Sequence, residues 1–277
     1  MSVAEKMTAI NDAIRGKTGK TEKLSLDEMA TEINEISTGE RDINPEWTDW
    51  SYFCQSRESL ATKLKYGDTS KGTNFSYMFG YCRSMTSAPA LDTSNGTNFR
   101  YMFRGCESMT SAPAIDTSKG TNFSSMFELC YALITVPKFD TSKGTDLSYM
   151  FRLCEELNSE IELNTSNCKN FNQMFNTCKK ITTIRNLDMS KATTLSGMFT
   201  DCNALVNLTF VGTINKTGLD VSYSKLLSHD SLMSIINALA DKTGVSGTFK
   251  VTLGATNLAK LTAEEIAIAE GKGWTLA

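Results

Sequence analysis

Large apolar residues recur every 24 positions through the middle of the chain. Met-Phe pairs mark the interval, at 78–79, 102–103, 126–127, 150–151, 174–175 and 198–199. Within one unit, Phe99, Met102, Phe103 and Cys106 are spaced as on one face of a helix or short helical turn. The segment 109–115 is short, rich in Thr, Ser and Ala, and predicts an extended strand. Stacked units of this kind would place strands side by side and apolar slots in a continuous column.

The units are joined by the sequence DTSKGTN or a close relative. Asp92 and the Thr-Ser that follows it can hydrogen-bond the local backbone as an Asx or Ser/Thr turn. We expect Gly96 to supply a positive φ angle and Thr97 to be the N-cap of the next helical turn. The same roles are expected for Gly120, Gly144, Thr121 and Thr145.

The aspartate of this turn recurs in a column, which raises calcium binding as an alternative to a purely structural role. The column comprises Asp68, Asp92, Asp116, Asp140 and Asp188. Asn164 interrupts it, and one carboxylate per unit is few against the roughly six to eight oxygen ligands of calcium. We therefore expect no metal and no cofactor.

Six of the eight cysteines share the 24-residue interval: Cys82, Cys106, Cys130, Cys154, Cys178 and Cys202. A fixed long interval puts each in the same slot of successive units, which favours buried free thiols over disulfides. Zinc sites use closely spaced cysteine pairs with histidines, whereas this chain has a single histidine, His229.

The flanks differ from the repeats, and the expected class is α/β. We predict a helical hairpin at 1–38 for docking or oligomerisation, a polar linker at 39–46, a leucine-rich-repeat-like solenoid of short strands and helical turns at 47–227, and an α/β cap at 228–277. The cap pattern predicts a helix from Asp230 to Gly244, a strand at 248–253 and a helix opening on Thr262 with Glu265 as capping partner. Residues 274–276 close the chain, and the tail is expected to continue the stack with two modified units and seal it.

Composition narrows the function classes. The net charge is −3, so no basic footprint for nucleic acid is present. No run of 18 apolar residues predicts a membrane span, and the first 20 residues lack the apolar region of a signal peptide. With one histidine outside the repeats, Ser-His-Asp and Cys-His chemistry lack a base, and we expect no enzyme activity.

Two parts of the chain resemble known protein families. The MFxxCxxL core, as at 150–157, and the LDTS turn, as at 91–94, resemble BspA-like leucine-rich repeats of bacterial surface proteins over about residues 47–227. That likeness implies a solenoid that binds proteins or host surfaces without catalysis. The segments at 9–36 and 231–277 are similar to the opening and closing modules of phage and prophage structural proteins of Gram-positive bacteria, which implies a tail, baseplate or adsorption role.

Binding specificity is expected in slots that vary while the core slots stay fixed. The candidates are Tyr77, Arg83, Tyr101, Arg104, Glu107, Glu128, Tyr131, Tyr149, Arg152, Glu155 and Lys179. The charges of Arg104, Glu128 and Arg152 alternate in sign over three successive units, so these residues could simply form ion pairs between units and have no part in binding. A column of small polar residues from Ser87 to Asn207 is a further candidate for contact with a sugar or peptide.

We therefore expect a phage or prophage virion protein that is assembled in the bacterial cytoplasm. Its partners would be a host cell-surface protein or glycan, and other virion proteins or itself through the hairpin at 1–38, which makes a homo-oligomer the expected state. The alternative is a BspA-like adhesin on a bacterial cell surface.

Overall fold

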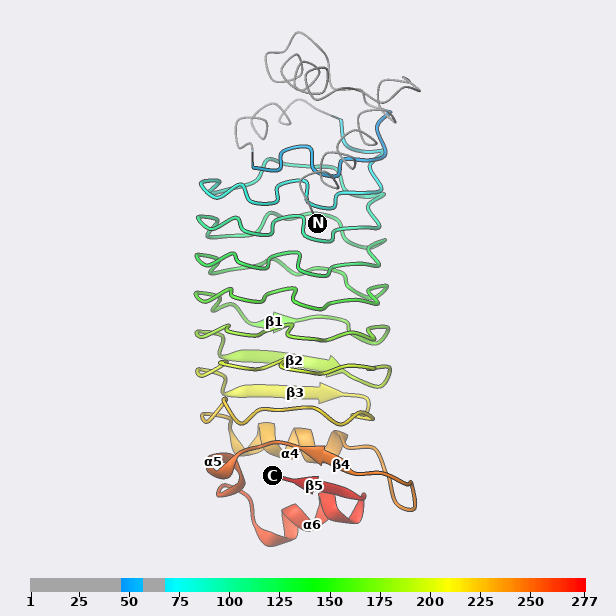
Figure 1. The fold of residues 1–277 in the computed structure, drawn as a ribbon, viewed down its shortest axis with the longest axis vertical. Coiled ribbons are helices and arrows are strands. Elements are labelled where there is room, and N and C mark those ends of the chain that lie inside the picture. The colour runs from blue at the N-terminus through cyan, green and yellow to red at the C-terminus, as the bar shows by residue number, and fades with distance from the viewer. Residues whose placement is uncertain (1–45, 57–67) are drawn as a thin grey trace.

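The computed structural model describes residues 46–56 and 68–277. The hairpin predicted at 1–38 and the linker, apart from Glu46, lie outside the described residues. Successive turns of the chain, here called coils, stack along the long axis (Figure 1). Parallel bridges join equivalent residues of neighbouring coils, from Asp49–Asn74 to Asn170–Thr194. Each step is 24 residues except the first, which is 25.

Each coil has a turn side, which runs from its bridge residue to its cysteine, as 98–106 do in one coil. Here the Met102 N–H donates to Phe99 O within the coil (3.1 Å), whereas the Tyr101 N–H donates to Ser124 O of the next coil (3.0 Å). Because only alternate N–H groups bond inside the coil, the backbone forms a series of tight turns and not a helix. The φ of 59° at Tyr101 is left-handed, which an α-helix does not allow. The expected helical turn is wrong, although the apolar residues of its spacing do face the core.

The core is built from identical side chains in register. The phenylalanines of the Met-Phe pairs stack with centroid separations of 5.3–5.9 Å in one ladder: Phe79, Phe103, Phe127, Phe151, Phe175 and Phe199. All eight cysteines are free and buried. Cys106 Sγ, for example, donates to Phe79 O of the preceding coil (3.2 Å). Burial raises the pKa of Cys130 to about 12. The prediction of core thiols is confirmed, and such a thiol is chemically inert at neutral pH.

The glycine and threonine of the connecting turn have other roles than expected. Gly96 has no positive φ; a Cβ there would lie 2.5 Å from Phe99 Cζ and 2.9 Å from Thr93 O, so glycine permits close packing. No helix follows Thr97, whose Oγ1 donates to Thr73 O of the preceding coil (3.1 Å). Both predictions are wrong at this turn. Gly120, Thr121 and Thr145 repeat these contacts, whereas a Cβ at Gly144 would lie 3.0 Å from Thr141 O and 3.2 Å from the ring of Phe123 in the preceding coil.

The opposite side of each coil, the strand side, is regular only in the later coils. β1 (Ile161–Glu162), β2 (Thr183–Asp188) and β3 (Asn207–Val211) form a parallel sheet in the order β1-β2-β3. A register shift interrupts the pairing of β2 with β3 between Ile184 and Leu187.

Prolines explain why the earlier coils differ. At the equivalent positions stand Pro89, Pro113 and Pro137, which have no N–H to donate to a ladder. The one isolated bridge on this side of the earlier described coils joins Ser111 and Thr135. The strand predicted at 109–115 is therefore reduced to a single bridge, and the extended ladder begins where the prolines end.

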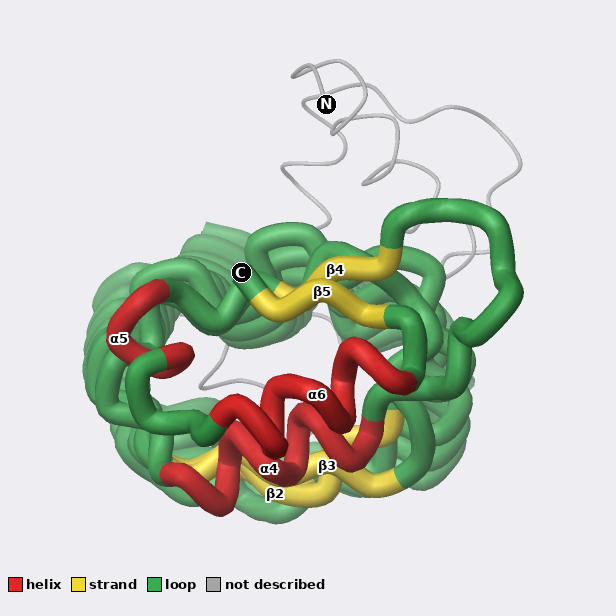
Figure 2. The backbone as a smooth tube through the Cα atoms, turned by 90° about the horizontal axis from the view of Figure 1, so that it is seen from below, coloured by secondary structure: helices red, strands yellow, loops and turns green. Residues whose placement is uncertain are grey.

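The C-terminal segment replaces strands with helices. α4 (His229–Ala238) lies against β3 and is capped by the Ser228 side chain (Figures 1 and 2). It begins one residue before the predicted start and ends six before Gly244. The reason is that Leu239 becomes extended and bridges Ile214 of the preceding coil.

The end of the stack contains the predicted strand and the predicted second helix, together with a closing strand that was not predicted. β4 (Phe249–Val251) pairs in parallel with β5 (Trp274–Leu276), and α6 (Ala263–Gly271) opens with the expected capping box of Thr262 and Glu265. A short helix, α5 (Ala255–Leu258), was not predicted. The described residues thus combine small parallel sheets with a few helices, in agreement with the α/β class. Within 46–56 and 68–277, no helix has both the length and the apolar character that crossing a bilayer requires.

Candidate binding surface

A ladder of tyrosines lies on the turn side of the first described coils. Tyr52 and Tyr77 stack with centroids 4.8 Å apart, and Tyr77 and Tyr101 with centroids 4.3 Å apart. Ser125 occupies the same slot in the next coil and separates Tyr149 from the ladder. Burial raises the pKa of Tyr77, with a further contribution from Tyr101, so its phenol stays protonated at neutral pH.

The backbone conformation at the repeat position of Tyr77 and Tyr101 does not require a tyrosine side chain. Tyr77 and Tyr101 have φ angles of 56° and 59°, and Gly197 has 62° in the same slot of a later coil. A left-handed backbone costs roughly 1–2 kcal/mol for a residue with a side chain. Ser125 and Gln173 also fill the slot, so the fold accepts small or flexible residues there. Strain of this kind, carried by bulky residues, is a reason to look for a role of the side chains themselves.

Two arginines meet on one buried glutamate beside this ladder. Glu128 is only 4% exposed; its Oε1 accepts from Arg152 Nη1 at 2.8 Å, and its Oε2 lies 2.9 Å from Arg104 Nε. The Arg104 contact is an ion pair without a well-directed hydrogen bond. Pairing between coils, the alternative compatible with the sequence, is therefore observed. The three side chains together still carry one net positive charge.

Arg100 is a further cation on this surface that the candidate set lacked. Its Nη2 lies 2.9 Å from the Tyr101 hydroxyl and its Cζ 4.5 Å from the centroid of that ring. Arg104 Cζ lies 5.2 Å from the same centroid and 5.3 Å from that of Tyr81, which was also missed. Over the described residues, no carboxylate forms an ion pair with Arg100. The sequence did distinguish this position, because an arginine at 100 replaces the serine that the neighbouring coils have at Ser76 and Ser124.

The slot after each cysteine forms a second column in which the charges are paired. Arg83 and Glu107 lie 3.3 Å apart, and Lys179 and Glu155 lie 2.6 Å apart. Tyr131 stands between these pairs and is 39% exposed. Tyr77, Tyr101, Arg104, Glu128 and Arg152 therefore lie in one series of contacts along the turn side, and the centroid of the Tyr149 ring lies 5.9 Å from Arg152 Cζ while the Tyr149 hydroxyl accepts from Asn172 Nδ2. The charged candidates of the second column form local ion pairs instead.

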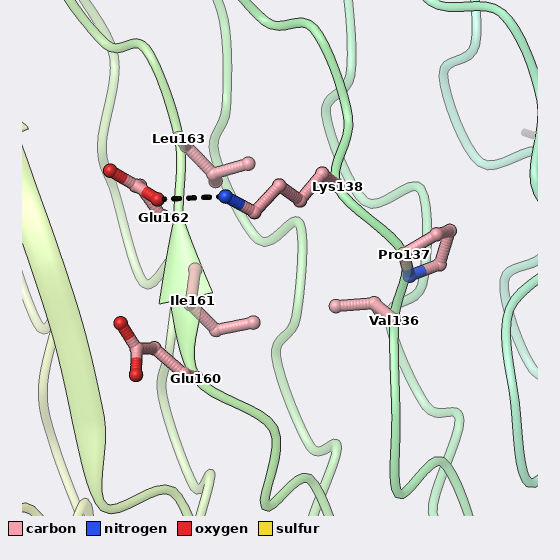
Figure 3. Close-up of a pocket in the computed structure, with 7 residues that line it drawn as sticks. All are labelled: Val136, Pro137, Lys138, Glu160, Ile161, Glu162 and Leu163. Atoms are coloured by element: carbon pink, nitrogen blue, oxygen red, sulfur yellow. Dashed lines mark hydrogen bonds and ion pairs between the residues drawn. The ribbon is translucent and has the colours of Figure 1, made fainter.

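The strand side has a pocket at the boundary between the proline-containing coils and the sheet (Figure 3). It has a volume of about 130 Å³ and is lined by Val136, Pro137, Lys138, Glu160, Ile161, Glu162 and Leu163. The Lys138 ammonium lies 3.2 Å from the Glu162 carboxylate, so its most prominent charges are paired. The neighbouring small polar column is partly used by the backbone, since the Val136 N–H donates to Ser159 Oγ.

The aspartate column serves the turns between coils. The N–H groups of Ser94, Ser118 and Ser142 donate to the Oδ1 atoms of Asp92, Asp116 and Asp140 at 2.9–3.0 Å. The predicted Asx turns are thus confirmed. No group of three or more His, Cys, Asp or Glu residues that could hold a metal ion lies within 46–56 and 68–277. His229 Nε2 lies 2.8 Å from Glu265 Oε1 and links α4 to α6.

These features define a repeat protein whose coils share one buried pattern and differ in their exposed side chains. The chain belongs to the family described as "Mycoplasma protein of unknown function, DUF285", whose model matches residues 28–134 and 110–210. This is a repeat family associated with BspA-like proteins. A search of curated proteins found no match.

Proposed function

We propose that this protein is a non-enzymatic structural protein of a phage or prophage virion, in the tail, baseplate or adsorption apparatus. In this proposal its coils form a leucine-rich-repeat-like solenoid that displays a binding surface toward the host cell. The observation that carries the binding role is the contrast between slots. The Phe, Met and Cys positions are constant and buried, whereas the adjacent turn-side slot holds Tyr, Ser, Gln or Gly on the same backbone.

A second candidate is a BspA-like adhesin on a bacterial surface that binds host protein or glycan. The description of the matching family favours it, because that description names a bacterial genus. The binding surface would be the same in both cases, but its location and its target would differ.

Immunogold electron microscopy separates the two. Antibodies against the coils should label particles released after prophage induction and leave uninduced cells unlabelled. Labelling of intact uninduced cells, with none on particles, would favour the adhesin. Purified protein that fails to adsorb to host cells as well would contradict the shared binding role.

Assembly through residues 1–38, with itself or with other virion proteins, is part of the same proposal. The mass of the full chain in solution should exceed that of a monomer, and the mass without residues 1–40 should fall to that of a monomer. A monomer in both preparations would contradict self-assembly through this segment.

A further inference from the structure

We infer that the turn side between Tyr77 and Arg152 binds a linear acidic polysaccharide, with Arg100 as its main anchor and Arg104 and Arg152 beside it. The inference rests on the proposed binding function and names the class of ligand for that surface. It also applies equally to a virion protein and to an adhesin.

The first argument is local charge. The chain as a whole is slightly acidic, with a net charge of −3. On the turn sides of the four coils from Tyr77 to Arg152, by contrast, three arginines face two acids, Glu128 and Asp146, which leaves one positive charge. Glu128 is taken up by Arg104 and Arg152, and Asp146 Oδ1 accepts from Ser148, so Arg100 has no paired carboxylate among the described residues. A local excess of positive charge on an acidic protein selects an anionic ligand and speeds its encounter.

The second argument is that Arg100 is held in place before any ligand binds. Its guanidinium lies over the Tyr101 ring and hydrogen-bonds the Tyr101 hydroxyl, while Tyr101 is itself fixed against Tyr77. A guanidinium has five N–H donors in a planar fork that matches carboxylate, sulfate and phosphate oxygens. Ordering a long side chain in advance reduces the entropy lost on binding.

The third argument concerns the shape of the ligand. Protein interfaces are anchored by Trp, Tyr and Arg side chains that insert into well-packed pockets of the partner, but none of the large exposed hydrophobic residues of the described chain comes from the slots of Arg100 or Arg104. The tyrosine faces are occupied by one another and by guanidinium groups. What remains is a line of donors along the stack, which suits an extended chain with repeated anionic groups.

The test uses the full-length protein and three polysaccharide probes: dextran sulfate, polygalacturonate, and uncharged dextran of matched length. We expect binding to the two acidic probes, weakening as salt rises, and no binding to dextran. The variant Arg100→Ser, which carries the residue of the neighbouring coils, should weaken binding about tenfold. Arg100→Lys should lose less, because it keeps the charge but not the planar fork.

The matched control is Lys119→Asn. It removes one exposed positive charge from the connecting turn, at a slot where Asn95 and Asn167 occur naturally, and should change binding less than twofold. Equal losses in both variants would show that net charge alone governs binding and would overturn the assignment. Single-stranded DNA of the same charge binding as tightly as the acidic polysaccharides would also overturn it.

Host cells distinguish this inference from the proposed function. Adsorption of the wild-type protein that Arg100→Ser does not reduce would leave the binding role intact and contradict the assigned site. Binding of the acidic probes without any adsorption to cells would support the site and contradict the role at the host surface.

Discussion

The turn side and the strand side of the same coils differ in regularity. On the turn side, successive backbone N–H groups donate alternately within their own coil and to the next coil. The coils that contain Phe99 and Phe171 differ in their exposed side chains but share this pattern. Among the described residues of the strand side, a ladder extends only from β1 to β3, after the last of the prolines at this position, Pro137. The stack therefore does not need a continuous sheet. Its regularity comes from the turn side, which frees the strand side to vary.

The largest effect is expected from crowding the turn-side core. In Gly120→Ala the new Cβ would lie 2.3 Å from Phe123 Cζ and 3.0 Å from Thr117 O, in a stack where Phe123 cannot move freely. We expect about 3 kcal/mol of destabilisation by urea unfolding. The control is Gly271→Ala at the end of α6, where nothing lies within 4 Å. Similar losses in both would show that the turn side is not specially tight.

A smaller loss is expected from neutralising the buried glutamate. Glu128→Gln leaves two guanidinium groups with a neutral partner, and we expect about 2 kcal/mol, since both arginines keep some exposure. Glu155→Gln removes an equivalent charge from the exposed pair with Lys179 and should cost under about 1 kcal/mol. Equal unfolding free energies for the two variants would contradict the importance of burial.

Acid should weaken the turns between coils. Hydrogen bonds from the Ser142 hydroxyl and N–H lower the pKa of Asp140, and the N–H and hydroxyl of Ser118 do the same for Asp116. A lowered folded-state pKa means that this stability is present above about pH 4 and is lost as the pH falls through the folded-state value. We expect the melting temperature to fall over this range.

Asparagine already occupies this slot at Asn164, where its Oδ1 accepts from the Ser166 N–H. The double variant Asp116→Asn and Asp140→Asn should therefore fold and show a shallower fall in melting temperature with acid. An unchanged pH profile would assign the acid sensitivity to other groups.

The smallest effect on stability is expected from a variant that makes the strand side more regular, like the turn side. Pro137→Ile supplies an N–H beside β1 and a side chain like that of Ile161 in the next coil. The added hydrogen bond and the lost rigidity of proline offset each other, so stability should change by less than about 1 kcal/mol. Amide exchange at 161–162 should nevertheless slow. Unchanged exchange would mean that proline is not what ends the ladder.

The sequence predicted the repeat length, the buried slots and the thiol column, because a fixed interval leaves only one way to stack equivalent residues. It failed on the local backbone. The spacing of Phe99, Met102 and Phe103 fits a helix, but half of the N–H groups bond to the next coil, and such long-range pairing leaves no periodic signal. Gly96 was misjudged for a related reason, since the Phe99 ring that excludes a Cβ is a matter of packing.

The candidate surface was foreseen in part. Variable slots identified Tyr77, Tyr101, Arg104, Glu128 and Arg152, but the sequence could not show that Glu128 is buried between two guanidinium groups. Arg100 was missed because a single departure from a serine column looks like ordinary surface variation. Its contact with Tyr101 becomes visible only once the left-handed backbone fixes where that ring lies.

The alternating hydrogen bonds of the turn side also bear on how such a gene can change. From the coil of Phe75 to that of Phe171, each coil offers its neighbour equivalent acceptors and donors on this side, so Gly96 joined directly to Thr121 would meet the same connection as Gly96 joined to Thr97. Recombination that gains or loses one whole unit would keep each core position in step and would only lengthen or shorten the molecule. A deletion of a few residues inside one unit would leave that coil too short to present all of its core side chains in register with its neighbours, so copy number is the variation that this architecture tolerates best.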